Sequence, residues 1–367
     1  MSLMTGSTTL TALRKKYNDF TNPSLEIIID GKRMVMTKKS MIQQLSVDLT
    51  SGYEASGCEF VISGCYDYQK KDFDSSIELP LQVGAKAEIL IGYQSKKESV
   101  FTGYIDTVSW EFSEDMSPSI RVRCMDAKGL LMKNRRLEEF RQTKPDAVVS
   151  YLLSQQPVRT YLTGKSVDMC SKEEVPLRAG MLTDYEIICQ QAQKMGFEFF
   201  IIDGKAYFQE IEKNKLPIMT LEPEAGIQSL TSSVSGNTLV NEVEVRAIDD
   251  KKGKLIKGNA RLTGRFSKGS TANRIKASTT QVFYEAGVES AMEAKKRAKV
   301  RIDAMKSGFG SLEITCMGIP ELVPGRFVKI DGFADAINDK YYITAVTHDL
   351  TDTYFTTTIR GRRDSIK

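Results

Sequence analysis

The chain reads LPLQVGAKAEILIGY at residues 79–93 and then VFTGYIDTV at residues 100–108. A similar order of residue types returns near the other end, where ELVPGRFVKI at residues 321–330 leads to YYITAVTHDL at residues 341–350. Apolar and polar side chains alternate in these stretches, which is typical of strands with one buried face. The repetition predicts two similar antiparallel β-barrels, one in each part of the chain.

Glycines and aromatic residues support the repeat. Gly84 and Gly325 each stand five residues before an isoleucine, and a further glycine follows in each copy, Gly92 in one and Gly332 in the other. Both copies then end in an aromatic-rich segment, with Trp110 and Phe112 in the first and Tyr354 and Phe355 in the second. Any two β-hairpins with a glycine turn share part of this pattern, so chance similarity stays an alternative.

The residues around the first copy also alternate. Strand-length segments separated by Gly, Pro, Ser or Asp clusters are expected at 25–30, 33–36, 42–49, 59–62, 87–91, 100–112 and 120–124. Such spacing favours an antiparallel barrel or sandwich, preceded by a short arm with a helix near residues 10–17.

After residue 126 the spacing of apolar residues changes from the two-residue period of a strand to the period of a helix. Helices are expected at 127–132, at 145–155 with Thr143 as a cap, and at 182–196. The last of these has Thr183 followed three residues later by Glu186, which is the pattern of a capping box, and it leads into a hairpin over 197–209. The middle of the chain is therefore predicted to be an inserted α/β unit.

The prediction is a mainly β protein with an α+β insert, in which a helix-plus-hairpin domain separates the two barrels. The expected divisions are an N-terminal arm (1–22), a first β-barrel (23–126), the inserted α/β domain (127–215) and a second β-barrel (216–367). The second barrel includes a basic loop at 251–276 and a helix at 287–306, whose lysines are expected to point outward from the barrel.

Composition narrows the class of function. The 51 basic and 47 acidic side chains give a formal charge of +4, too small to indicate a dedicated nucleic-acid binder. No apolar run is long enough to span a bilayer, and the N-terminus lacks the apolar core of a signal peptide, so we expect no membrane insertion. The six cysteines are expected to be buried thiols in a reducing cytoplasm.

Catalytic residues are not expected in this chain. His348 is its one histidine and lies in an alternating strand, which favours a packing or hydrogen-bonding role. The adjacent carboxylates at 138–139, 173–174 and 249–250 point apart and are interpreted as solvated charge. We therefore predict no enzyme activity, no cofactor and no metal site.

The strongest local charge feature is the segment KKGKLIKGNARLTGRFSKGSTANRIK at residues 251–276. It contains no Asp or Glu, and its composition predicts a mobile loop or an extended hairpin. Its basic residues are candidates for contacting DNA or a partner protein: Lys251, Lys252, Lys254, Lys257, Arg261, Arg265, Lys268, Arg274 and Lys276. A solvated loop that orders only on assembly is the alternative.

The two repeated stretches quoted above, with GIPELVPGRFVKI and YYITAVTHDL in the second copy and the helix-plus-hairpin between them, resemble the late control gene D proteins of phages. The chain is also similar to the hub half of VgrG proteins of type VI secretion. This resemblance implies a baseplate hub in a phage, prophage or phage-like injection particle, joining a six-fold tail tube to a three-fold spike or tip. Because VgrG-like chains continue into a spike and this sequence stops at Lys367, the spike is expected to be a separate protein.

The expected partners follow from the resemblance. They are two further copies in a homotrimer, the tail tube protein, a spike or tip protein, other baseplate proteins, and DNA or the tape-measure protein passing through the channel. The expected location is the virion tail, after synthesis and assembly in the bacterial host cytoplasm. Two other functions stay open, the hub part of a tail-tip protein that recruits a cell-wall hydrolase and a receptor-binding tail protein.

Overall fold

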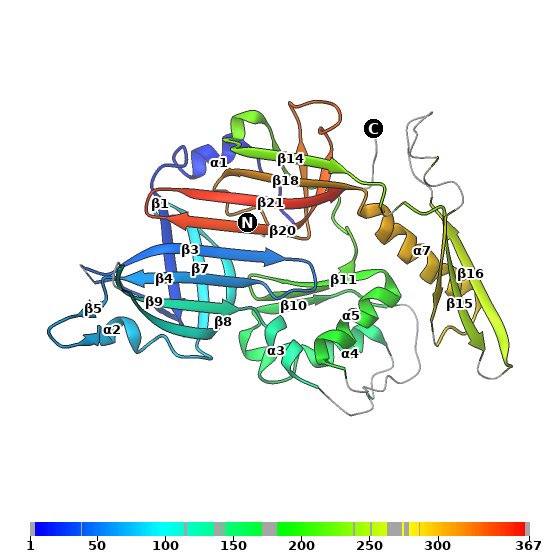
Figure 1. Ribbon diagram of the computed structural model, residues 1–367, viewed down its shortest axis with the longest axis horizontal. Helices are drawn as coiled ribbons and strands as arrows, with labels where there is room; N and C mark the ends of the chain where they lie inside the picture. The colour runs from blue at the N-terminus through cyan, green and yellow to red at the C-terminus, as the bar shows by residue number, and fades with distance from the viewer. Residues whose placement is uncertain are drawn as a thin grey trace.

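The computed structural model shows an elongated, mainly β protein (Figure 1). It describes residues 4–37, 39–113, 116–135, 140, 144–170, 182–237, 239–249, 252–262, 274, 279–285 and 287–363. A 13-stranded sheet dominates, and both ends of the chain contribute to it. The predicted fold class is confirmed.

The first part of the chain supplies half of this sheet. Its strands follow the order β3 (Met41–Thr50), β4 (Gly57–Ser63), β9 (Met116–Met125), β8 (Lys96–Ser113), β7 (Lys86–Tyr93) and β1 (Pro23–Ile29). All neighbours are antiparallel, and the short β2 (Lys32–Arg33) completes a hairpin with β1. The smaller elements are α1 (Leu10–Lys16), β5 (Tyr66–Asp67), β6 (Asp72–Phe73) and α2 (Ser75–Glu78).

The last part of the chain supplies the other half. Its order is β14 (Ser229–Val234), β18 (Gly310–Met317), β21 (Phe355–Arg363), β20 (Lys340–Thr351), β19 (Phe327–Ile330) and β13 (Pro217–Leu221), with η2 (Pro223–Ala225) after β13. These pairs are antiparallel except β13 with β19, which are parallel. The two halves join where β3 pairs with β20, so they form one continuous sheet.

One hydrophobic core serves both halves. Leu45, Val47 and Leu49 of β3 are buried, and so are Ile343 and Val346 of β20, all in the same apolar cluster. Alternation along each strand places these side chains on one face and polar side chains on the other. The alternation of apolar and polar residues in the sequence therefore indicates which face of the sheet covers the core.

Residues at the end of the N-terminal helix α1 contact both halves of the large sheet. The ammonium group of Lys16 forms ion pairs with Glu98 of β8 and with Glu321, which precedes β19. The hydroxyl of Tyr17 donates to Glu321 at 2.8 Å. Because Glu321 is buried, these contacts neutralise a charge that would otherwise be costly in the core.

The inserted unit has its own apolar core. It contains α3 (Lys128–Lys133), α4 (Pro145–Leu152), η1 (Val158–Tyr161), α5 (Asp184–Met195) and a sheet of β10 (Gly164–Val167), β12 (Lys205–Glu210) and β11 (Phe197–Ile202). The capping box of α5 is confirmed, with Thr183 and Glu186 exchanging hydrogen bonds. The predicted cap of α4 is wrong, because Lys144 takes that position and makes no side-chain cap bond.

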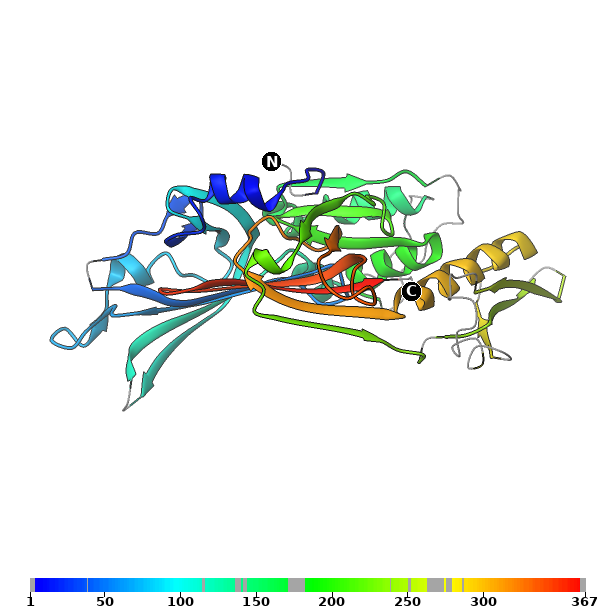
Figure 2. The ribbon, with the colours of Figure 1, turned by 90° about the horizontal axis from the view of Figure 1, so that it is seen from above.

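A third apolar cluster lies at one end of the molecule, where the yellow strands and gold helix project in Figure 2. There β15 (Glu242–Asp249) pairs with β16 (Lys254–Arg261) and β17 (Thr280–Tyr284), and α7 (Ala291–Ser307) packs against this sheet. The helix was expected to pack on the second barrel. It packs on β16 instead, because Gly258 has no side chain and lets the backbone approach Ala294 and Lys295 closely.

Candidate assembly interface

The two halves of the large sheet repeat one strand order. Reading across the sheet, β3, β4, β9, β8, β7 and β1 correspond in order to β14, β18, β21, β20, β19 and β13. An ion pair repeats with them, since Arg123 of β9 contacts Glu59 of β4 at 2.6 Å and Arg360 of β21 contacts Glu313 of β18 at 3.0 Å. The repeat extends beyond the stretches that suggested it, and chance similarity does not account for it.

Gly84 and Gly325 occupy equivalent places before β7 and β19. Both have a positive φ, +90° and +81°, a conformation that favours glycine. Gly84 donates its N–H to the carbonyl of Ile105, and Gly325 donates to the carbonyl of Ile343. A register shift follows each isoleucine, in β8 against β9 and in β20 against β21. These matches fix the residue-by-residue correspondence between β8 and β20.

Other parts of the sequence repeat are not equivalent. Gly92 lies within β7, whereas Gly332 follows β19 with a φ of +80°. The aromatic residues also differ, because Trp110 and Phe112 belong to β8 while Phe355 begins β21. Among the repeated glycines and aromatic residues, only the glycine before β7 and the glycine before β19 have the same structural role in both halves.

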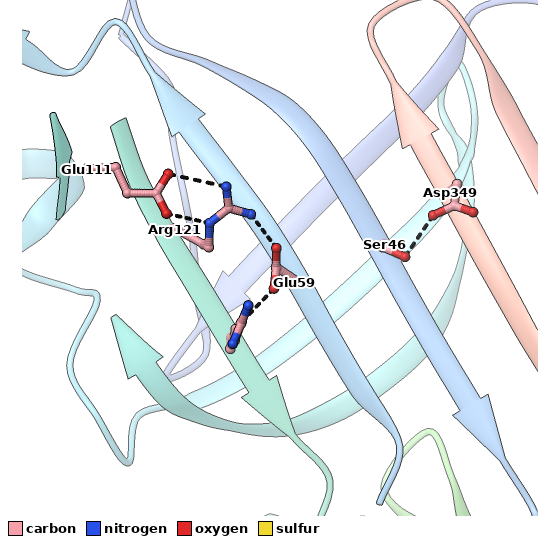
Figure 3. Close-up of polar contacts among 6 residues, drawn as sticks. Ser46, Glu59, Glu111, Arg121 and Asp349 are labelled. Carbon is pink, nitrogen blue, oxygen red and sulfur yellow. Dashed lines mark hydrogen bonds and ion pairs between the residues drawn. The ribbon is translucent and has the colours of Figure 1, made fainter. Parts of the chain in front are cut away.

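The junction between the halves is a strand pair in which β3 aligns with residues 345–351 of β20 (Figure 3). Ser46 donates to the carboxylate of Asp349 at 2.7 Å, and Thr347 donates to that of Asp48 at 2.6 Å. On the other face, His348 lies opposite Val47, and both are buried. The junction thus combines a polar outer face with an apolar core face.

The outer face of the sheet continues this polar character. Arg121 of β9 donates to Glu111 of β8 and also pairs with Glu59 of β4 (Figure 3). The hydrogen bond from Arg121 holds the pKa of Glu111 below its usual value. Across the sheet, Thr315 and Thr358 share a hydrogen bond at 3.0 Å. The face presents charges that are largely paired within it.

On the core-facing side of β8, the last side chains of the strand are apolar and exposed. Trp110 and Phe112 are large apolar side chains on β8, yet half or more of each is exposed. Val234 on β14, at the far edge of the sheet, is 53% exposed. Sequence reasoning placed Trp110 and Phe112 in a strand and did not single out their exposure, because alternation alone does not show whether a neighbouring strand is present.

The structure separates the basic segment into parts. Lys254, Lys257 and Arg261 lie on β16, so the hairpin alternative holds there, and Lys252 lies in the turn before it. Arg261 forms an ion pair with Glu242 at 3.3 Å, and Lys257 lies 4.0 Å from Glu244. Arg274 is exposed. The remaining candidates, Lys251, Arg265, Lys268 and Lys276, lie outside the described residues.

The helix α7 presents less positive charge than its sequence suggests. Lys295 and Lys296 are exposed, as expected. Arg297, however, is buried between Glu285 and Glu293, at 3.1 Å and 2.7 Å. The helix buries Ala294, Ala298 and Ile302 against its sheet and leaves Met292 exposed.

His348 is fully buried, and its Nδ1 lies 2.9 Å from the hydroxyl of Thr357. Burial lowers its pKa to about 3, so the imidazole is neutral at physiological pH. This environment fits the packing and hydrogen-bonding role predicted for it. Of the adjacent carboxylates, only Asp249 lies in the described part of the chain, where it ends β15.

All six cysteines are free thiols, and five of them are buried. Within the described ranges, no group of three or more His, Cys, Asp or Glu side chains is arranged to hold a metal ion. No helix in that part of the chain is both long and apolar enough to cross a membrane.

A further polar contact ties the insert to the second half. The hydroxyl of Tyr342 on β20 donates to the carboxylate of Glu198 on β11, with an oxygen–oxygen distance of 2.6 Å to Oε1. Burial raises the pKa of Glu198 to about 7. The insert is therefore anchored to the sheet through hydrogen bonds as well as through its apolar contacts.

Solved structures with this fold include phage tail proteins and a secretion component. A tail protein from Neisseria meningitidis MC58 superposes with a TM-score of 0.70 at 15% identity, covering 94% of this chain and 98% of that one. The 43 kDa tail protein of prophage MuSo2 from Shewanella oneidensis gives 0.70 at 14% identity, covering 94% and 100%. An E. coli component of the type VI secretion system gives 0.57 at 11% identity, covering 91% and 76%.

These superpositions show that the chain has the fold of phage tail proteins. Residues 21–352 match the family model described as Alg8 N-terminal domain, and the chain belongs to that family. No curated protein matches the sequence.

Proposed function

We propose that this protein is the structural hub of a phage-type tail baseplate, of the kind formed by late control gene D proteins. The observation that carries the proposal is the repeated half-sheet, which has the same strand order, glycine turn and ion pair in both copies. The fold it shares with tail proteins, and with a type VI secretion component, supports the same role.

The two similar half-sheets in each chain would let a three-fold assembly match a six-fold one. Three copies around one axis would present six similar half-sheets, which match a six-fold tail tube on one side, while the inserted unit occurs three times and matches a three-fold spike or tip. A homotrimer of this kind converts one symmetry into the other. Its role is structural rather than catalytic, and its place is the baseplate of a tail.

The proposed partners follow from the surfaces. The polar outer face of the large sheet suits a channel wall, because its charges are paired and its Ser and Thr side chains hold little apolar surface against passing DNA or tape-measure protein. The hairpin β15–β16, with Lys252, Lys254, Lys257 and Arg261, is proposed to contact a neighbouring baseplate protein or DNA. We propose the predicted divisions near residues 22, 126 and 215 as the domain boundaries.

The test is co-assembly with the tail tube protein of the same tail. Mixed with tube protein and imaged by electron microscopy, the hub is expected to form rings that cap tube ends, with six similar lobes. Light scattering on the isolated protein is expected to give the mass of a trimer. Rings without pseudo-six-fold symmetry, or no attachment to the tube, would contradict the hub function.

A further inference from the structure

A cavity lies where three parts of the fold meet (Figure 1). Its wall is formed by the end of α5 and the residues after β12 in the insert, by the second half of α7, and by Arg362 near the end of β21. Its volume of about 380 Å³ lies within the range of about 300–1,000 Å³ that is usual for ligand sites. Binding sites are common where separate packed units meet. The hub function gives this cavity no role.

Backbone contacts fix the shape of the cavity. Gly196 ends α5 with a φ of +72°, and a Cβ at this position would lie 2.9 Å from a methyl group of Val300 on α7. The two helices therefore meet at a point where a side chain would collide. The N–H of Ile211 donates to the carbonyl of Gly196 at 3.3 Å, which holds the chain after β12 against the end of α5. The walls from the insert and from α7 are thus in direct contact.

Arg362 is held in place within this wall. Its guanidinium carbon lies 5.2 Å from the centroid of the Tyr342 ring, so the cation stacks on an aromatic face. The hydroxyl of Tyr342 donates to Glu198 at 2.6 Å, and the side-chain amide of Gln209 donates to the same carboxylate at 3.3 Å. The insert thereby fixes the ring on which the guanidinium rests.

Arg362 has no counter-charge of its own. Its buried Nε has no hydrogen-bond partner, and across the described ranges no carboxylate forms an ion pair with this guanidinium. Burial raises the pKa of Glu198 to about 7, so this neighbouring carboxyl is only partly ionised at neutral pH. A positioned arginine without a paired carboxylate has donors available for an anion, and its planar group suits carboxylate or phosphate.

The other charges in the wall distinguish between these anions. Besides Arg362, the ionisable residues that line the cavity are Lys215, Lys306, Glu210, Glu212 and Asp303. The acidic side chains would repel a nucleic acid, which carries about one negative charge per nucleotide. A single carboxylate that is flanked by basic and apolar residues complements the same wall. The charge pattern therefore favours a protein segment over a nucleic acid.

We propose that this cavity binds an acidic side chain of a partner protein, with its carboxylate on the guanidinium of Arg362. The residues that flank this side chain in the partner are apolar, to pack against Met195 and Val300, and basic, to face the acidic part of the wall. The inference goes beyond the hub function and does not depend on it, because the whole site lies within one chain.

NMR of the methionine methyl groups in the full chain tests the site. The probes are acetylated five-residue peptides with a central glutamate and with leucine or lysine at each flanking position. The methyl signal of Met195, which lines the cavity, is expected to shift on titration. The signal of Met292, 83% exposed and near the other end of α7, should stay unchanged. The same peptides with a central glutamine should bind about tenfold more weakly, because they lack the charge.

Substitutions separate the arginine from the cavity. Arg362→Gln is expected to weaken the glutamate peptides by about tenfold and to leave the glutamine peptides unchanged. The matched control is Arg360→Gln, on the same face of the same strand but paired with Glu313 outside the cavity, and it should change neither. Ala304→Phe, at an exposed position of the wall, fills the cavity without removing a charge and should weaken both kinds of peptide. The methyl spectra show whether each variant is folded.

The outcomes that overturn the proposal are distinct from failure of the hub. Equal binding of glutamate and glutamine peptides, unchanged binding in Arg362→Gln, or no shift of Met195 with any peptide contradicts the acidic-segment site. Inorganic phosphate and a short single-stranded oligodeoxynucleotide are titrated in parallel. A Met195 shift at a lower concentration of either one than of the peptides assigns the cavity to phosphate instead. None of these results bears on whether the protein forms rings on a tail tube.

Discussion

The two halves of the large sheet share a strand order but differ in what covers the same strand. In the second half, β20 is flanked by β3, and His348 is fully buried. In the first half, residues 107–112 of β8 have no such neighbour among the described residues, and Trp110 at the equivalent position is half exposed. The same strand edge is therefore paired with a further strand in the second half, whereas in the first half it has no such partner among the described residues. Open edges of this kind are where assembly is expected.

The halves also differ in how tightly the shared glycine turn is packed. A Cβ at Gly325 would lie 2.5 Å from the ring of Phe200, which is fully buried and cannot move away cheaply. A Cβ at Gly84 would meet its nearest neighbour, the hydroxyl of Tyr161, at 3.9 Å. The same turn is therefore under a steric constraint in only one half.

The largest expected effect uses this contrast. Gly325→Ala should lower the free energy of unfolding by about 3 kcal/mol, since it adds a steric clash to an unfavourable φ. Gly84→Ala should lower it by only about 1 kcal/mol, from φ alone. Urea denaturation of the two variants measures both values. Equal losses would show that the clash at Gly325 is relieved and that the halves tolerate the turn equally.

A second prediction concerns the buried imidazole of His348 on β20. His348 has a folded-state pKa of about 3, below its value of about 6.5 in the unfolded chain. Protons therefore bind the unfolded state first, and stability is lost as the pH falls from about 6.5 toward 3. Between pH 7 and pH 5 this loss should be about 2 kcal/mol.

The measurement compares wild type with His348→Gln by urea denaturation at pH 7 and at pH 5. The stability difference between the two proteins should change by about 2 kcal/mol in favour of the variant at pH 5. Other groups, including Glu198, contribute to both proteins alike and cancel. A difference that is independent of pH would show that His348 is not held neutral by burial.

The smallest expected effect concerns the repeated ion pair. Arg360→Gln removes an isolated, exposed pair with Glu313, and we expect a loss of less than about 0.5 kcal/mol. Arg123→Gln removes one member of a network with Glu59 and Arg121, and we expect a loss of up to about 1 kcal/mol. Thermal unfolding at low and high salt measures both. A larger loss for Arg360→Gln would reverse this ranking of the two halves.

Local signals in the sequence were reliable where neighbouring residues complete the structure by themselves. Thr183 and Glu186 cap α5 because both partners of the capping box lie within four residues. Asp203 and Gly204 form the turn of β11–β12, both with positive φ, because only local conformation is needed there. Thr143 was a plausible cap for α4 by the same reasoning, but Lys144 was closer to the first helical residue.

Contacts between distant segments could not be predicted in this way. The docking of α7 on β16 depends on Gly258 facing the helix, which the spacing of apolar residues in α7 does not reveal. The burial of Arg297 depends on Glu285, which lies outside the helix. Half of Trp110 is exposed because, among the described residues, this part of β8 is flanked by a strand on one edge alone. A sequence pattern has the same form whether a second flanking strand is present or not.

The sequence by itself determined the mainly β class, the inserted helix and hairpin, and the repeat of a glycine-led strand in both halves. These features follow from alternation, capping and turn chemistry, which act over a few residues. Only the tertiary structure decided that β3 joins β20, that the two halves share one core, and that, among the described residues, β14 and the end of β8 each have one strand neighbour. Strand pairing across hundreds of residues depends on which edges meet in space, and local patterns carry no information about that choice.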